Sequence, residues 1–347
     1  MSRQYIAAFV TAVAAMTTVA VVVAGQAPDG WTVPRTPDGR PDLNGIWAND
    51  SATPLQRPEV LGDRTTLTDE EVAALRVASA EALGEGGDAV FGDAVFLKAL
   101  ASVNEAEGQE PAAKPKFWSY GQQWMGNRWW DNRTSLIVDP PNGRLPTRSA
   151  EAEERAQRRR EARNVPAPAP KTVSEELDRL DPGVRCRGGR PLLSGRGYNS
   201  NYQIFQGADY VGIQIEMHHE TRLIPIGEAA PSEVGTPSVM GSSHGYWDGD
   251  TLVVETTNLS RGVDGSTPNV RVTERLSRVG PEQLQYEYTV DDPSTWTQPW
   301  TARIFLRPAP GTGAIYEYAC HEGNYAAELS LVSTRAEEAR NAMKEQQ

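Results

Sequence analysis

The chain has 347 residues with a formal net charge of −12; 39% of the residues are hydrophobic and 23% are charged. This length suits one large domain or two modest ones, and the composition is typical of a globular protein that buries a core. The acidic balance argues against nucleic acid and anionic lipid as partners, because binding to both depends on Lys and Arg.

Residues 1–25 have the pattern of a signal peptide. Arg3 gives a positive start, the stretch 6–23 is almost wholly apolar, and Ala24 and Gly25 supply small residues for cleavage. We expect export to the periplasm or the medium, with cleavage after Gly25. The apolar stretch is close to the ~20 residues that span a bilayer, so an uncleaved anchor is the alternative.

Residues 26–164 are predicted to form an extended arm, helices and a Trp-rich segment. Pro and Gly keep 31–49 extended, and a first short strand begins near Ile46. Thr68 and Glu71 have capping-box spacing ahead of a helix that runs to about Leu83. We expect a second helix over 95–105, aromatic side chains crowded over 117–130, and a strand over 134–138.

Charge and proline content mark a boundary after this region. Residues 151–163 are charged, with alanine as the only apolar residue, which predicts a solvated helix or a linker. Residues 165–170 alternate with proline, so 165–185 is predicted to be a linker that ends with a short helix over 174–180.

Residues 186–330 are predicted to be an antiparallel β-domain, followed by a polar tail or helix over 331–347. Period-two patterns separated by turn signals predict strands over 202–205, 210–226, 252–257, 270–279, 283–290, 300–306 and 315–320. The fold class is therefore mainly β, with a C-terminal barrel or sandwich and an N-terminal helical, Trp-rich region.

The two cysteines, Cys186 and Cys320, are expected to pair, because export places them in an oxidising compartment. Such a bond closes a long loop and stabilises by roughly 4–5 kcal/mol in the chain-entropy model. The alternative is two free thiols; a CxxC metal or redox motif is absent from the sequence.

The candidate acid–base residues are His219, Glu274 and His321. Alternation places His219 on the apolar face of the 210–226 segment and His218 on its polar face. Glu274 shares a side with valine and leucine, which is costly without a partner such as a nearby arginine. His321 follows Cys320, so a disulfide would hold it rigidly. The alternatives are a satisfied core histidine, a structural ion pair and a strand end.

A divalent metal is a second possibility, with His219, His244 and His321 as ligands. His244 lies in the Gly/Ser-rich stretch 241–245, which predicts a loop. No HxH or HxxxH spacing supports this site, so the ligands would have to converge from distant strands.

Aromatic side chains are a further set of candidate ligand-binding residues. Trp124, Trp129, Trp247 and Tyr318 are candidates for stacking on a sugar or an aromatic ring. The alternative interpretation is a packing layer that seals the N-terminal region onto the barrel.

Four motifs resemble a large, uncharacterised family of exported bacterial proteins. They are residues 36–47 (TPDGRPDLNGIW), 133–144 (RTSLIVDPPNGR), 249–258 (GDTLVVETTN) and 316–325 (YEYACHEGNY). The resemblance spans nearly the whole mature chain and implies export and a shared fold, but no activity. The family often has an apolar residue at position 218 and histidine next to it, which favours His219. The C-terminal strands also resemble lipocalin-type barrels.

Three functions follow as hypotheses. The first is an exported protein that binds a small aromatic or sugar-derived ligand in a barrel pocket and transforms it by acid–base chemistry with His219, Glu274 and His321. The second is a metal-dependent enzyme with a histidine site. The third is a non-catalytic carbohydrate-binding or structural envelope protein, in which the aromatic residues matter.

Overall fold

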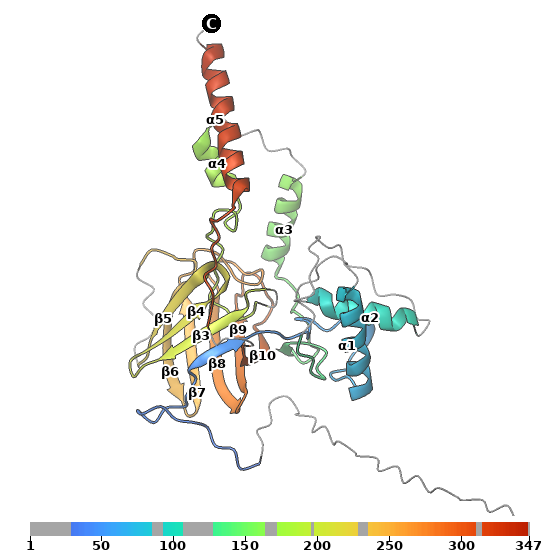
Figure 1. Cartoon of the computed structure of the whole chain (residues 1–347). Helices are drawn as coiled ribbons and strands as arrows, with labels where there is room; N and C mark the ends of the chain where they lie inside the picture. Colours follow the sequence, from blue (N-terminus) through green and yellow to red (C-terminus); the bar gives the residue numbers. More distant parts are fainter. Residues whose placement is uncertain are drawn as a thin grey trace, which may run out of the picture.

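The computed structural model describes residues 29–84, 93–106, 128–163, 172–195, 198–227, 235–309 and 314–345. One antiparallel sheet, curled into a near-closed barrel, dominates this part of the chain (Figure 1). Its strands follow the order β5 (Glu220–Pro225), β4 (Tyr210–Ile215), β3 (Asn201–Gln206), β1 (Gly45–Ala48), β10 (Trp300–Pro308), β9 (Gln283–Asp291), β8 (Arg271–Gly280), β7 (Thr251–Thr257) and β6 (Ser242–Asp248). A short strand, β2 (Ile137–Asp139), pairs with β10 beside this order. The predicted mainly β class is confirmed, and the sheet curls rather than splitting into a sandwich.

The two edge strands, β5 and β6, meet where the barrel nearly closes. Ile226 forms a parallel bridge with Gly245, and the Gly227 N–H donates to the Gly245 carbonyl at 3.0 Å. A Cβ at Gly245 would lie 2.7 Å from Ile226 Cδ1. Glycine at this position therefore permits the close approach that joins the edges.

Large side chains fill the barrel. Every second residue of β9 points inward, and Tyr286 and Tyr288 stack at 5.7 Å between their ring centroids. Trp300 packs edge-on against Tyr288 and is fully buried. This alternation of inward apolar and outward polar residues is what a half-buried strand requires, and it makes the barrel a packed core.

The first short strand lies inside the sheet. β1 pairs with β3 on one side and β10 on the other, so a segment near residue 46 completes the barrel formed by strands after residue 200. The proposed division of the chain into an N-terminal region, a linker and a β-domain stays a prediction.

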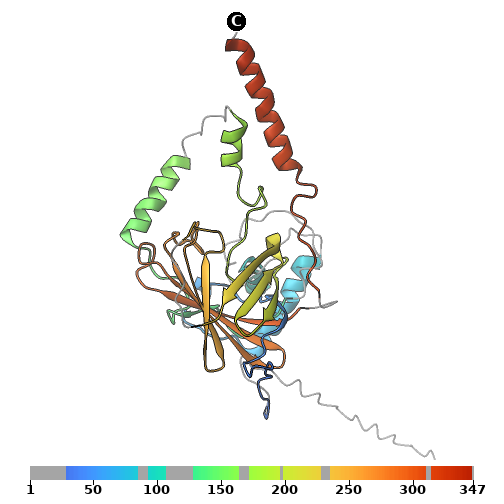
Figure 2. The same cartoon turned by 90° about the vertical axis from the view of Figure 1, so that its left-hand side faces the viewer.

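Helices pack outside the barrel (Figures 1 and 2). α1 (Asp69–Gly84) and α2 (Asp93–Ala106) form their own small core, in which Phe96 stacks on Trp130. The capping box is confirmed: Glu71 N–H donates to Thr68 Oγ1 at 3.2 Å, and Thr68 N–H donates to Glu71 Oε2 at 2.7 Å.

Three further helices lie at one end of the barrel: α3 (Ala150–Arg163), α4 (Val173–Arg179) and α5 (Tyr325–Glu345). α5 projects away from the sheet (Figure 2), and α4 contacts it between Ser330 and Glu338. It begins at residue 325, earlier than the predicted tail at 331. Among the described residues, no helix is both long and apolar enough to cross a bilayer.

The prediction of one strand over 210–226 was wrong. β4 ends at Ile215, a short 3₁₀ turn covers Met217–His219, and β5 returns antiparallel with Ile215 opposite Glu220. The turn changes the phase of the alternation, so Arg222 faces the interior while Leu223 is 65% exposed. His219 therefore does not share an apolar face with Ile215.

Two other local predictions were also wrong. Residues 314–320 are irregular, because the sheet nearly closes and offers no edge with which a further strand could pair. The stretch 241–245, predicted as a loop, belongs largely to β6, and His244 pairs with Glu255 of β7. Pairing on β7 overrides the low strand propensity of glycine and serine.

Candidate functional site

A pocket of about 250 Å³ opens at the end of the barrel where β3 begins and β4 ends. We call it the His218 pocket. Its walls come from the segment 188–200, the start of β3 and the β4–β5 turn, and they include Arg190, Leu192, Tyr198, Tyr202, Met217 and His218. This volume is slightly below the ~300–1,000 Å³ of typical small-molecule sites, so the pocket suits a single-ring compound.

Strained backbone presents His218 to the pocket. His218 has φ 63° and ψ 7°, and His219 has φ 54°, so two successive non-glycine residues are left-handed. Each such residue costs on the order of 1–3 kcal/mol and persists only where the surroundings enforce it. The turn is fixed by the His219 N–H, which donates to the Glu216 carbonyl at 3.0 Å.

The His218 ring is confined and electrically neutral. Burial lowers its pKa; the negative charge of Glu220 opposes this effect and the positive charge of Arg261 adds to it. Its Nδ1 is buried and has no hydrogen-bond partner in the described part of the chain. The neutral His218 imidazole therefore lines the pocket, and its Nδ1 is a buried polar nitrogen without a protein partner in the described residues.

Two glycines let the chain lie against this turn. A Cβ at Gly188 would overlap the His218 imidazole, and a Cβ at Gly189 would lie 2.6 Å from Glu220 Cγ. The Gly189 carbonyl also accepts a hydrogen bond from Arg261. The glycine pair, which the sequence suggested only as a turn, is needed for close backbone approach.

Tyr318 packs on the other side of His218, with 5.1 Å between ring centroids and an edge-on geometry. Burial raises the pKa of Tyr318, and the neighbouring Tyr198 phenol, with which it shares a hydrogen bond, raises it further. Tyr318 is therefore a protonated phenol at neutral pH. It was chosen from the sequence as a ligand-binding residue, and the structure places it against the pocket histidine.

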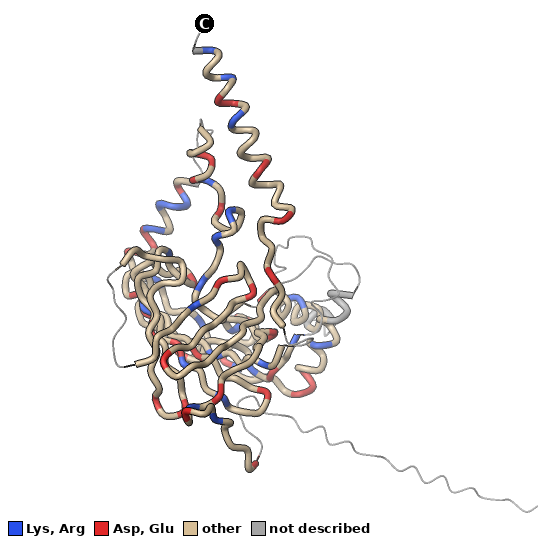
Figure 3. Tube along the Cα trace, turned by 60° about the vertical axis from the view of Figure 1, so that its left-hand side comes forward, with Lys and Arg blue, Asp and Glu red and all other residues tan. Residues whose placement is uncertain are grey.

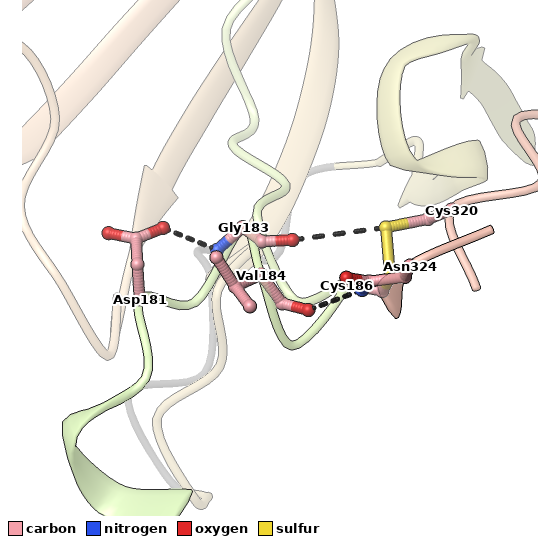
Figure 4. The surroundings of a disulfide bond; sticks show 6 residues. All are labelled: Asp181, Gly183, Val184, Cys186, Cys320 and Asn324. Atoms are coloured by element: carbon pink, nitrogen blue, oxygen red, sulfur yellow. Dashed lines mark hydrogen bonds between the residues drawn. A yellow bond between two sulfur atoms is a disulfide. The ribbon is translucent and has the colours of Figure 1, made fainter. Parts of the chain in front are cut away.

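The predicted disulfide is confirmed and holds these walls together (Figure 4). Cys186 and Cys320 are bonded, with 5.7 Å between their Cα atoms. Asn324 Nδ2 donates to the Val184 carbonyl at 2.7 Å beside the bond. Because Gly188 follows Cys186 by two residues and Tyr318 precedes Cys320 by two, the crosslink ties both neighbours of His218 to one point.

Glu216 holds the turn in place through hydrogen bonds to the start of β3. Its side chain is buried, and its Oε2 accepts from Asn201 Nδ2 at 2.8 Å and from the Asn201 N–H at 3.4 Å. Burial raises the pKa of Glu216, and these two hydrogen bonds oppose the shift. Glu216 therefore links the end of β4 to the start of β3.

Glu274 lies in a different environment, sealed inside the barrel. It forms a bidentate ion pair with Arg222, at 3.1 Å and 2.7 Å, and accepts from the Tyr286 hydroxyl at 2.8 Å. The sequence suggested a nearby arginine of the same strand as its partner, but the partner comes from β5. Burial and the charge of Glu274 raise the pKa of Tyr286 well above its usual value, so the phenol keeps its proton.

This buried network, which we call the Arg222–Glu274 network, also fixes the floor of the His218 pocket. Arg222 Nη1 donates to the Pro191 carbonyl at 2.7 Å, and the Leu193 N–H donates to the Tyr286 hydroxyl at 3.2 Å. Residues 191–193 lie between the network and the pocket. Glu274 is therefore placed to act as a structural anchor for the site.

The structure does not assemble the predicted acid–base set in this pocket. His219, Glu274 and His321 are all absent from its lining, and the two histidines are exposed. His218, which sequence alternation assigned to a solvated face, occupies the site. The glycine pair after Cys186 is the sequence signal that could have indicated close packing here, but it was interpreted only as a turn.

The predicted metal ligands are likewise not brought together. His244 is buried in β6, whereas His219 and His321 are exposed. Within the described ranges, no group of three or more His, Cys, Asp and Glu side chains is arranged to hold a metal ion.

The predicted tryptophans lie elsewhere. Trp129 packs edge-on against Phe305 of β10 at 6.2 Å, and Arg307 lies 5.7 Å from its ring centroid. Trp247 packs on the barrel core, with Arg40 at 5.9 Å from its ring. Both contacts agree with a packing layer. Trp124 lies outside the described residues.

Comparisons with known protein families and with curated proteins found no match. Among solved structures, the chain is similar to a "secretary abundant heat soluble (SAHS) protein" from Ramazzottius varieornatus, with 16% sequence identity and a TM-score of 0.22. The alignment covers 31% of this chain and 70% of that chain. Membership of the exported bacterial family remains a prediction from the motifs.

Proposed function

We propose that the protein binds a small, single-ring organic compound in the His218 pocket, either an aromatic or a sugar-derived one. The observation that carries this proposal is a concave site whose wall combines the neutral imidazole of His218 with apolar side chains. A polar ring on a mainly apolar wall is the arrangement that orients a small organic ligand.

The surroundings of the pocket supply the rest of the recognition. Leu192, Ile215 and Met217 offer apolar contacts, while Arg190 and the hydroxyl groups of Tyr198 and Tyr202 add polar groups to the lining. A few polar groups on a mainly apolar wall fix the orientation of a ring without a large charge. The two classes of compound differ in whether apolar contact or hydroxyl hydrogen bonds dominate.

Saturation-transfer NMR with phenol and with glucose as probes tests the proposal. The informative variant is His218→Asn, because asparagine tolerates left-handed backbone but lacks the imidazole. His219→Asn is the matched control, since His219 has the same conformation and is exposed. We expect binding of at least one probe, weakened about tenfold or more by His218→Asn and unchanged by His219→Asn. Equal binding by both variants would contradict the proposal.

The neutral imidazole of His218 supports acid–base chemistry as a second function. A neutral imidazole whose pKa lies below its usual value accepts a proton at neutral pH and returns it to a product. Turnover of the bound probe, followed by NMR between pH 5 and 8, tests this. Turnover that His218→Asn removes supports catalysis, whereas unchanged probe at every pH leaves binding as the function.

We also propose that the protein is exported, with residues 1–25 as its signal. The Cys186–Cys320 bond supports this, because disulfides persist in oxidising compartments. N-terminal sequencing of protein from the periplasmic fraction is the test. A new N-terminus at Gln26 supports cleavage, an intact Met1 in the membrane fraction supports the anchor, and intact protein in the cytoplasm contradicts export.

A further inference from the structure

A second cleft, of about 340 Å³, lies between α3 and the turn around Gly265. We call it the arginine cleft. One wall carries Arg148, Arg155, Arg159 and Arg160, and the other carries Ser266, Thr267 and Thr295. None of the residues that line it has a carboxylate, and it shares no lining residue with the His218 pocket.

The sequence places three of these arginines on one face of α3, and Arg148 lies just before the helix. Positions 152, 155, 156, 159 and 160 recur at the three- and four-residue spacing of a helix face. Alanines 152 and 156 are small and let the helix approach the barrel, and Ala152 is buried. The prediction of a solvated helix is confirmed, and the two alanines provide a narrow face toward the barrel.

Arg155 anchors the helix to the barrel. Its Nη2 donates to the Ser294 carbonyl and to Thr295 Oγ1, both at 3.0 Å, and its Nη1 pairs with Glu151 at 2.6 Å. The Arg155 guanidinium is therefore occupied by protein groups, and its hydrogen bonds set the distance between the walls of the cleft.

Two arginines remain for a ligand. Arg148 and Arg159 are exposed and form no ion pair with any other described residue, whereas Arg160 forms an ion pair with Glu153 at 3.7 Å. Figure 3 shows basic positions gathered along this helix, in a chain whose net charge is −12. The cleft is thus a concentration of positive charge on an acidic protein, which attracts anions.

Hydrogen bonds and a tight turn fix the opposite wall of the cleft. Buried Asp292 accepts from the Thr267 N–H at 2.6 Å and from Thr295 Oγ1 at 2.7 Å. A Cβ at Gly262 would overlap the Ser266 carbonyl, so glycine there permits the tight turn. Ser266 Oγ accepts from Trp296 Nε1 at 3.0 Å, which leaves its own hydrogen to donate into the cleft.

We propose that the arginine cleft binds a phosphate or sulfate ester of a small molecule. The wall from α3 presents guanidinium groups, whose planar N–H pairs match the oxygens of a tetrahedral anion. The Ser266 hydroxyl donates from the facing wall. A group that only accepts hydrogen bonds and carries negative charge satisfies both walls at once.

Isothermal titration calorimetry of the full-length, oxidised protein tests this site, with glucose 6-phosphate and glucose 6-sulfate as probes and glucose as the uncharged control. The test variant is the double substitution Arg148→Gln and Arg159→Gln. Neither residue has a structural ion pair in the described chain, so the variant is expected to fold. The control is Arg158→Gln, which is on the same helix but outside the cleft and pairs with Glu154.

We expect at least one ester to bind, the double variant to weaken it about tenfold or more, and Arg158→Gln to leave it unchanged. Stronger binding of the phosphate than of the sulfate identifies recognition of the extra charge, and the reverse identifies a sulfate site. Equal ester affinities in both variants, or no binding of either ester, would overturn the proposal.

Discussion

The Arg222–Glu274 network and the His218 pocket lie next to each other, and both bury titratable side chains, but they differ in how those side chains are paired. In the network, Glu274 receives hydrogen bonds from Arg222 and Tyr286. In the pocket, His218 Nδ1 has no partner among the described residues. Glu274 is held by protein side chains and stabilises one arrangement, although Arg222 Nε in the same network has no partner among the described residues. The candidate binding residue differs from the structural carboxylate because His218 lines a pocket, whereas Glu274 is bound by protein groups inside the barrel.

The largest expected effect comes from breaking the network. Glu274→Ala leaves Arg222 charged and unpaired in the barrel, so we expect the free energy of unfolding to fall by about 3–5 kcal/mol. Urea denaturation measures this change. Arg275→Ala on the same strand is the control, because its pair with Asp248 is exposed and contributes less than about 1 kcal/mol.

A double substitution sharpens the same comparison. Arg222→Met with Glu274→Leu removes both charges and is expected to be more stable than Glu274→Ala alone. If the single and double variants lose the same stability, the cost does not arise from an unpaired charge. The pocket floor would still be altered, because Arg222 also contacts the Pro191 carbonyl.

Removal of the disulfide is expected to have the next largest effect on stability. Its two cysteines are 134 residues apart, so the chain-entropy model predicts a stabilisation of about 5 kcal/mol, and measured losses are usually about 2–5 kcal/mol. We expect Cys186→Ala with Cys320→Ala to lower the urea midpoint and to weaken probe binding in the His218 pocket. Reduced stability with unchanged binding would show that the crosslink does not hold Tyr318 against His218.

Gly188→Ala tests the close approach that forms the pocket wall. The added methyl overlaps the His218 ring, so we expect a loss of about 1–3 kcal/mol and weaker probe binding. Gly227→Ala is the control, since its Cβ would meet nothing within 4 Å. Equal melting temperatures for the two variants would contradict the packing described here.

The smallest expected effect is on the pH dependence of stability. Burial lowers the pKa of His218, so the unfolded chain takes up a proton first as the pH falls through about 6.5. The stability that depends on a neutral His218 is fully present above that pH and is lost as the pH falls below it. The wild type should therefore lose more stability between pH 7.5 and 5.5 than His218→Asn does, as urea unfolding at each pH measures.

Other titratable groups with a shifted pKa do not change the expected difference between the wild type and His218→Asn. The pKa of Asp292 is lowered by hydrogen bonds that exceed the cost of its burial, so its contribution is lost only below about 3.8. The pKa of Glu216 is raised, which acts in the opposite direction, but it is common to both proteins. Parallel pH profiles for the two proteins would show that His218 titrates as it does in the unfolded chain.

Local patterns in the sequence determined much of this protein. The capping box at Thr68 predicted where α1 begins, and period-two alternation placed Glu274 on the apolar side of its strand, because these signals depend on neighbours only a few residues apart. The pairing of Cys186 with Cys320 followed from there being two cysteines in an expected oxidising compartment.

Only the tertiary structure decided which histidine occupies the pocket. A 3₁₀ turn with two left-handed residues interrupts the alternation after Ile215, and no sequence period records that change of phase. The partner of Glu274, the strand formed by His244 and the arginine cleft likewise depend on segments tens of residues apart. Such contacts form only when the sheet closes, because closure brings together backbone and side chains that local sequence leaves unpaired.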